Sequence, residues 1–313
     1  MGFLARIFQK RLGTPPDRAA TAPLDPQITP GIELRRHVVV GAAHSSGLER
    51  KSDDDALLII SGSADGHEGM VDFGLFCVAD GLGGYDNGQL ASAISVRTVA
   101  HRLTREVFLR LLESEPGDEE EDDLESMVQS AFIEANDLVR DQADGGATTL
   151  TIALLLGEYM MIGHVGDTRA YSISRDKIEA LTRDQSLVQK LVETGTITKD
   201  EAAESPHRNV LWNAMGRTEN LKVDVFSHSV VNDSYILLCS DGLWGEVDEK
   251  EIQRIVLNFE HPQAACNALV DAATEAGGSD NITAVLIQFP SKSRFLLFTG
   301  DSTVSARGTT TVV

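Results

Sequence analysis

The stretch "LFCVADGLGGYDNGQLAS", Leu75–Ser92, carries an apolar run up to a single carboxylate, Asp80, and then breaks into glycines. One explanation is a hairpin turn, because glycine adopts positive φ at little cost and aspartate bonds its own backbone. The other is a cation site, in which a carboxylate is held at the end of a core strand beside bare backbone. By itself this stretch favours the turn.

Carboxylates also stand at the ends of several other apolar segments. An ionised carboxylate in such a place is costly unless it is paired or coordinated, and the nearby cations, Arg50 and Arg169, are too few to neutralise all of them. Donor sets made of oxygen alone select hard cations such as Mg²⁺, Mn²⁺ or Ca²⁺. The repetition therefore favours a cation site over a series of turns. The carboxylates concerned are Asp80, Asp167, Asp241, Asp280 and the run Asp53, Asp54 and Asp55.

The composition narrows the class of protein. With 313 residues the chain can bury one large core or two smaller ones, and a net charge of −21 argues against nucleic acid or an anionic membrane as the main partner. Three cysteines, Cys77, Cys239 and Cys266, lack CxxC spacing and are expected to be buried small hydrophobes. The acidic run 113–125 is expected to be a solvated loop. No signal peptide or membrane-spanning stretch is recognisable, so a cytoplasmic protein is expected.

The chain is expected to divide into three parts. Residues 1–33 form an extension with a Pro-rich linker, 34–290 a globular domain, and 291–313 a Ser/Thr-rich tail. Residues 1–12 have an amphipathic pattern with basic side chains, which is compatible with docking on a membrane surface or a partner. A frayed end or local packing is favoured over docking for so short a segment.

Hydrophobic periodicity predicts an α+β fold. Short apolar or alternating runs that end in turn residues indicate strands, and longer stretches with helical spacing lie between them. Two consecutive central helices suggest two packed sheets flanked by helices instead of a doubly wound sheet. Strands are predicted within 35–46, 55–62, 73–80, 149–157, 159–167, 170–174, 177–182, 234–242 and 282–289, and helices within 88–112, 124–143, 249–258 and 261–277.

The order of the motifs resembles that of the metal-dependent serine/threonine protein phosphatases of type 2C, in particular their bacterial members. The resemblance runs from about residue 38 to 289 and rests on eight motifs in register. It implies a central sandwich of two antiparallel β-sheets flanked by helices on both faces, with a small flap subdomain at about 183–217. The motifs are "GLERKSDDDA", "VADGLGG", "GATTL", "HVGDTRAY", "LTRDQSLVQKLVETGTIT", "PHRNVLWNAMG", "LLCSDGLW" and "SDNITAV".

The resemblance also implies a site with two ions of Mn²⁺ or Mg²⁺ and, in many members, a third and weaker ion. Arg50 matches the arginine that clamps the substrate phosphate, and Asp54 and Asn281 match supporting positions around the ligands. The metal ligands carried over are Asp80 as the bridging carboxylate, the backbone carbonyl of Gly81, Asp241 and Asp280 at the first ion, Asp55 at the second ion partly through water, and Asp167 with Asp241 at the third.

Such a site would hydrolyse phosphoserine and phosphothreonine. Two adjacent cations lower the pKa of a bridging water, and the resulting hydroxide attacks phosphorus in line while Arg50 and the metals neutralise the equatorial oxygens. The implied partners are phosphorylated proteins, with a bacterial Ser/Thr kinase and its substrates among them, and a monomer is expected. The alternative is a catalytically silent sensing or scaffolding module, against which the intact acidic set counts. A calcium-stabilised structural protein would need a tight Asp-x-Asp-x-Asp-Gly loop, which the chain lacks.

The chain departs from the family pattern at several positions. Leu82 stands where animal members often carry the histidine thought to protonate the leaving oxygen, so the proton donor is unassigned. Asp54 is shorter than the usual glutamate, which puts its reach in doubt. The flap around Thr194–Glu204 is expected to shape the access of protein substrates.

Other candidate residues are interpreted as structural. His164 is expected to be a hydrogen-bonded core histidine, and Trp212 and Trp244 to be packing residues. Arg169 pairs either with an active-site carboxylate or with a structural partner; the sequence leaves both open.

Overall fold

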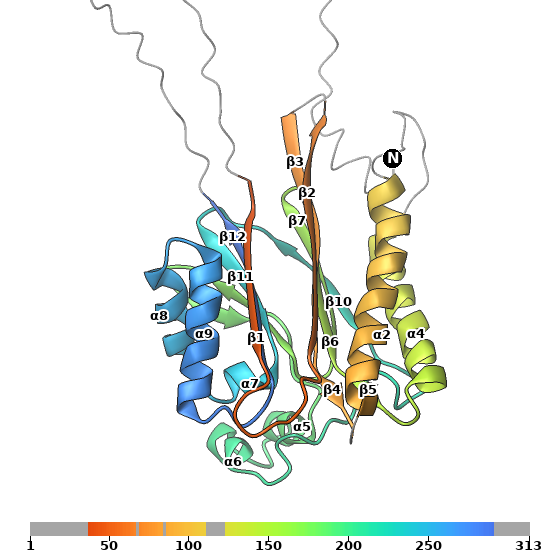
Figure 1. Ribbon diagram of the computed structural model, residues 1–313, viewed down its shortest axis with the longest axis vertical. Coiled ribbons are helices and arrows are strands. Elements are labelled where there is room, and N and C mark those ends of the chain that lie inside the picture. The colour runs from red at the N-terminus through yellow and green to blue at the C-terminus, as the bar shows by residue number, and fades with distance from the viewer. Residues whose placement is uncertain (1–36, 67–68, 84–85, 111–122, 291–313) are drawn as a thin grey trace, which may run out of the picture.

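The computed structural model describes residues 37–66, 69–83, 86–110 and 123–290 and contains two antiparallel sheets of five strands each. The sheets pack face to face (Figure 1). The first has the order β1 (Val39–Ser45), β12 (Ile282–Phe289), β11 (Ser234–Cys239), β8 (Arg169–Ile173) and β9 (Ile178–Ala180). The second has the order β10 (Asp224–Ser229), β7 (Tyr159–Val165), β6 (Leu150–Leu156), β3 (Gly69–Ala79) and β2 (Ala56–Gly66).

Helices cover the outer face of each sheet, so the fold is the predicted α+β sandwich (Figure 1). The first sheet carries α8 (Glu249–Asn258) and α9 (Pro262–Ala276). The second sheet carries α2 (Asp86–Leu103) and α4 (Leu124–Gln142), and α2 continues into a π-helical turn, η1 (Thr104–Leu109). Three short elements lie at the end of the sandwich where β3 and β11 terminate: α7 (Asp241–Trp244) and the paired strands β4 (Gly81–Leu82) and β5 (Ala147–Thr148).

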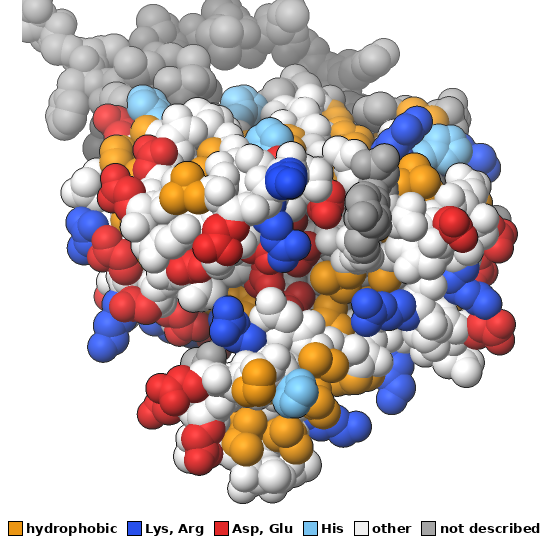
Figure 2. Space-filling model, turned by 60° about the horizontal axis from the view of Figure 1, so that its bottom comes forward, with side chains coloured by type: hydrophobic (Ala, Val, Ile, Leu, Met, Phe, Trp, Pro, Cys, Tyr) orange, Lys and Arg blue, Asp and Glu red, His pale blue; other side chains and the backbone are white. Residues whose placement is uncertain are grey.

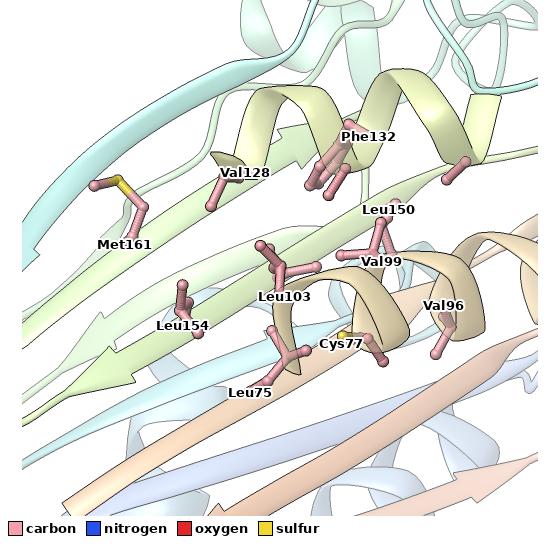
Figure 3. Packing of buried hydrophobic residues seen from close by; sticks show 14 of the residues in the cluster. Leu75, Cys77, Val96, Val99, Leu103, Val128, Phe132, Leu150, Leu154 and Met161 are labelled. Carbon is pink, nitrogen blue, oxygen red and sulfur yellow. The ribbon is translucent and has the colours of Figure 1, made fainter. Parts of the chain in front are cut away.

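Alternation along each strand divides the core into layers. In β3, Leu75 and Cys77 face α2 and α4, whereas Phe76 and Val78 face the opposite sheet. Figure 3 shows the helix-facing layer, in which Phe132 of α4 lies among aliphatic side chains from α2 and the sheet. Each large apolar side chain buried in this way contributes about 1.5–3 kcal/mol. This packing makes the strands a rigid support for the loops at their ends.

Local sequence signals fix the helix ends. Asp123 caps α4 by accepting a hydrogen bond from the backbone N–H of Glu125, and Pro262 occupies the first turn of α9. The predicted acidic loop 113–125 therefore ends earlier than expected, because its last residues cap and begin α4; residues 111–122 lie outside the described residues. The predictions for the N-terminal extension and for the tail also lie outside them.

The predicted strands and helices are present, and each cysteine is buried. The short strands β4 and β5, the edge strand β10 and the single turn α7 were not predicted. No helix among the described residues is long and apolar enough to cross a membrane.

The topology brings the carboxylates to one end of the sandwich. β3, β7 and β11 run toward this end and are followed by Asp80, Asp167 and Asp241, respectively. β2 and β12 begin there and are preceded by Asp55 and Asp280. Antiparallel pairing thus converts carboxylates that are far apart in the sequence into neighbours.

Candidate active site

Asp80 lies at the centre of the carboxylates and is held by its own backbone. Its N–H donates to Thr149 Oγ1 at 2.9 Å, and its carbonyl accepts from the Thr149 N–H at 2.9 Å and from Thr148 Oγ1 at 2.8 Å. Burial of the carboxyl raises its pKa well above the ordinary value, and repulsion from neighbouring carboxylates adds to this. Those neighbours are Asp241, Asp55, Asp167 and Asp280.

Asp55 uses one carboxylate oxygen to join the two sheets. Its Oδ2 accepts hydrogen bonds from Ser240 Oγ at 2.7 Å and Thr283 Oγ1 at 2.6 Å. Its Oδ1 is buried without a hydrogen-bond partner. Burial, followed by repulsion from Asp241, raises the pKa of Asp55 to about 7 despite these two hydrogen bonds. Asp55 Oδ1 is therefore available to bind a cation, in a site that has little other positive charge.

Asp241 begins α7 directly after the end of β11. Burial and repulsion from Asp280 raise its pKa to about 6. The following residue has to be glycine, since a Cβ at Gly242 would lie 2.0 Å from the carbonyl oxygen of Asn281. A Cβ at Gly81 would likewise lie 2.5 Å from the carbonyl oxygen of Asp54. The glycine after each aspartate thus allows close packing of backbone against backbone.

Asn281 connects the loop before β2 to the start of β12. Its Nδ2 donates to the carbonyls of Ser46 at 3.1 Å and Ser52 at 2.9 Å, and its Oδ1 accepts from the Asp54 N–H at 2.8 Å. Asp54 in turn accepts at its carbonyl from the Gly81 N–H at 3.1 Å. The support that Asp54 gives comes through its backbone, because its buried Oδ1 has no hydrogen-bond partner.

Arg50 brings positive charge to the carboxylates. Its Nη2 donates to Asp280 Oδ2 at 2.6 Å, and this hydrogen bond raises the pKa of the guanidinium. The Arg50 side chain is 52% exposed, so it can reach a ligand that enters from solvent. Figure 2 shows acidic side chains gathered in a hollow in the middle of this end of the molecule, with basic side chains at its rim.

Asp167 is positioned by a partly buried network around Arg169. The indole N–H of Trp244 donates to the Asp167 carbonyl at 3.0 Å, and Arg169 stacks on the Trp244 ring at 3.6 Å. Arg169 also makes a bidentate ion pair with Asp184 at 2.9 and 2.8 Å. The structure thus decides the question left open for Arg169 in favour of a structural partner. Burial, followed by repulsion from Asp241, raises the pKa of Asp167, whose Oδ1 has no hydrogen-bond partner.

The remaining candidates separate into core and surface. His164 is buried, with Nδ1 2.9 Å from Thr151 Oγ1 and Nε2 3.0 Å from the Arg183 carbonyl, which confirms a core histidine. Trp244 is partly buried in the network described above. The packing prediction for Trp212 is wrong, because this side chain is 45% exposed. The sequence contained no signal for this exposure, since Trp212 is flanked by Leu211 and Asn213, which are buried.

The carboxylates offer oxygen donors, which are the ligands that a hard divalent cation prefers. Among the residues that the structure describes, no three His, Cys, Asp or Glu side chains already stand in the geometry of a ligand cluster. The fit therefore rests on two observations. Buried carboxylate oxygens of Asp55 and Asp167 lack hydrogen-bond partners. Burial, and then mutual repulsion, raises the pKa values of the carboxyls of Asp55, Asp80, Asp167 and Asp241. Oxygen ligands of this kind are those of Mg²⁺ and Mn²⁺.

The sequence matches a known family over most of the described region. The profile of protein phosphatase 2C matches residues 52–285. The serine/threonine phosphatase stp of Listeria innocua is 33% identical over 217 residues, which cover 67% of this chain and 82% of that protein. The serine/threonine protein phosphatase PstP of Mycobacterium tuberculosis is 31% identical over 214 residues, which cover 68% of this chain and 40% of that protein.

Solved structures show the same architecture. The crystal structure of the M. tuberculosis phosphatase PstP/Ppp superposes with a TM-score of 0.67 at 27% identity, covering 81% of this chain and 99% of that one. The PstP catalytic domain in complex with two manganese ions superposes with a TM-score of 0.64 at 26% identity, with 81% and 99% coverage.

Proposed function

The chain belongs to the protein phosphatase 2C family and is a serine/threonine phosphatase of the bacterial type, and from this premise we propose that the carboxylates around Asp80 form its reaction centre. The observation that carries the proposal is the convergence of carboxylates, contributed by five separate segments, at one end of the sandwich. Ordinary folding stability gives no reason to gather like charges in this way.

The proposed centre holds two ions of Mn²⁺ or Mg²⁺. Two manganese ions are bound in the PstP catalytic domain, and the donor chemistry of this chain supports the same occupancy. When bound, such ions supply Lewis acidity toward the phosphoryl group and lower the pKa of water. The proposed ligands are Asp80, the carbonyl of Gly81, Asp241, Asp280 and Asp55 for the two ions, with Asp167 and Asp241 for a third, weaker ion.

Arg50 is proposed to bind the phosphate. The planar guanidinium matches phosphate oxygens bidentately and stays charged at every working pH. In the described structure it holds Asp280, so binding of a phosphoryl group would exchange that carboxylate for phosphate oxygens and release Asp280 toward the cation site. Arg50 would thus help to order the carboxylates before substrate enters and to neutralise the phosphoryl group afterwards.

Leu82 contributes packing to the site. Its side chain packs on Ala147, Leu211 and Ala214 and carries no proton to donate. The leaving serine or threonine oxygen is therefore proposed to take its proton from water at the site. Asn281 and the backbone of Asp54 hold the loops on either side.

The proposed site can be tested by metal binding independently of turnover. Calorimetric titration with Mn²⁺ should give two ions per chain for the wild-type protein and fewer for Asp241→Asn. Asp233→Asn, a matched change at an exposed position, should bind as the wild type does. Equal stoichiometry in all three proteins would exclude the assignment of Asp241.

The proposal also covers the substrates of the phosphatase, its oligomeric state and the bounds of its domain. We propose phosphorylated proteins as substrates, with a Ser/Thr kinase of the same cell generating them, and a cytoplasmic monomer whose phosphatase domain spans 34–290.

Residues 183–217, which include α5 (Leu187–Glu193) and α6 (Lys199–Ala203), form the proposed flap below the site (Figure 1). Deleting Thr194–Glu204 should lower activity on phosphoproteins more than on a small aryl phosphate, whereas equal losses would argue against a role in protein access.

A further inference from the structure

The Trp212 surface is a second feature at the catalytic end, and we define it as the exposed indole of Trp212 with the ammonium groups of Lys190 and Lys222. Trp212 is 45% exposed, and the neighbouring Val210 is 44% exposed. Lys190 Nζ lies 5.9 Å and Lys222 Nζ 5.7 Å from the centre of the indole ring. Both cations are within the range of attraction to an aromatic face.

This surface is built into the fold at a fixed place. The backbone N–H of Trp212 donates to the backbone carbonyl of Gln185 at 3.1 Å, and Leu211 pairs with Ser186 in an isolated β-bridge. On the other side, Leu211 and Ala214 are buried with Ala147 and contact Leu82. Leu82 belongs to β4, so the Trp212 surface is joined through packed side chains to the short strand that begins directly after the central carboxylate, Asp80.

The charge of the surface is opposite to that of the protein as a whole. The chain carries a net charge of −21, and Figure 2 shows acidic side chains gathered in the hollow at this end of the molecule. Yet neither Lys190 nor Lys222 forms an ion pair with any of the residues the structure describes. Glu193, the acidic residue closest in sequence to Lys190, is paired with Arg183 instead. Two unpaired ammonium groups on an exposed indole form a binding point for an acidic side chain.

A phosphoserine or phosphothreonine held at the reaction centre would extend its flanking residues across this end of the molecule. Each extended residue advances the chain by about 3.3 Å, so residues a few positions from the phosphate fall on the rim of the site. Figure 2 shows hydrophobic and basic side chains between the acidic hollow and the lobe below it. The partner that fits is therefore the segment flanking the phosphoresidue in a substrate.

We propose that the Trp212 surface selects phosphoprotein substrates with Asp or Glu within a few residues of the phosphorylated side chain. Lys190 and Lys222 bind the acidic side chain, and Trp212 presents an apolar face to the adjoining peptide. The proposal rests on the proposed function, because it locates the flank of a substrate whose phosphate is bound at the carboxylates. It adds a sequence preference that the metal site alone cannot provide.

The test compares two phosphothreonine peptides that differ only in replacement of flanking Asp and Glu by Asn and Gln. For the wild-type protein with Mn²⁺, kcat/KM should be about 5-fold to 10-fold higher for the acidic peptide, mainly through KM. The double variant Lys190→Gln/Lys222→Gln should lose this preference and keep its activity on a small aryl phosphate. Trp212→Phe should retain part of the preference, since the ring face is smaller but present.

The matched control is Lys177→Gln/Lys250→Gln, which removes the same number of charges from exposed positions outside residues 183–217. It should keep the preference for the acidic peptide. Equal kcat/KM for the two peptides with the wild-type protein, or an unchanged preference in Lys190→Gln/Lys222→Gln, would overturn the proposal. If the wild-type protein released no phosphate from either peptide or from the aryl phosphate, the result would contradict the proposed function itself, and with it the substrate preference that rests on it.

Discussion

The carboxylates around Asp80 predict an unusual dependence of stability on pH when divalent cations are removed. The pKa of Asp55 rises from 3.8 to about 7 on folding. Between these values the unfolded chain has already lost the proton that the folded chain keeps, so stability falls as pH rises. From pH 5 to pH 7 the loss from Asp55 alone is about 2 kcal/mol. For a domain of this size, about 2 kcal/mol lowers the melting temperature by roughly 4–8 °C.

The measurement is thermal unfolding in chelator at a series of pH values, for the wild-type protein and Asp55→Asn. An asparagine oxygen can still accept from Ser240 Oγ and Thr283 Oγ1, so the variant removes the charge and keeps both hydrogen bonds. Buried His164, whose pKa burial lowers, acts in the opposite direction below its ordinary pKa. The decisive quantity is therefore the difference in melting temperature between the two proteins.

This difference should grow in favour of Asp55→Asn as the pH rises from 5 to 7. Millimolar Mn²⁺ should reverse the order, because binding to the native wild-type protein stabilises it by mass action. A difference that stays constant with pH in chelator would refute the claim that Asp55 is forced into a buried, mutually repelling set.

Three further substitutions test separate parts of the structure. Arg169→Lys should cost about 2 kcal/mol in urea unfolding, since an ammonium cannot reproduce the bidentate pair with Asp184; no change would mean that the pair is not stabilising. Gly242→Ala should cost about 3 kcal/mol or more, because its Cβ would meet the carbonyl of Asn281; a wild-type melting temperature would contradict this packing. Arg50→Lys should raise the KM for a phosphopeptide about 10-fold while kcat changes less; the opposite pattern would remove Arg50 from phosphate binding.

Long apolar runs made most of the fold predictable. The segments around β3, β6, β7 and β12 combine strand-like composition with clear ends, and the helices on the outer faces have regular periodicity. β10 was missed because its sequence, "DVFSHS", has little apolar content and lies at a sheet edge, where pairing with β7 supplies the structure. β4 and β5 are two residues each and form only because the chain is already positioned by its neighbours.

The candidate site was predictable where a carboxylate ends a buried strand. Asp80, Asp167 and Asp241 are of this kind, and only the antiparallel topology explains why they meet. The sequence could not reveal partners that depend on three-dimensional contact. The pairing of Arg169 with Asp184 and the exposure of Trp212 both depend on how residues 183–217 fold back against the sheet.

The most direct test of the account is phosphate release from a phosphothreonine peptide by the purified protein, with Mn²⁺ and with chelator, beside Asp80→Asn. The account predicts release that requires Mn²⁺ and is lost in the variant, although the variant folds and melts in chelator at or above the wild-type temperature. Release that persists in chelator or in folded Asp80→Asn would contradict the assignment of the reaction centre to this carboxylate.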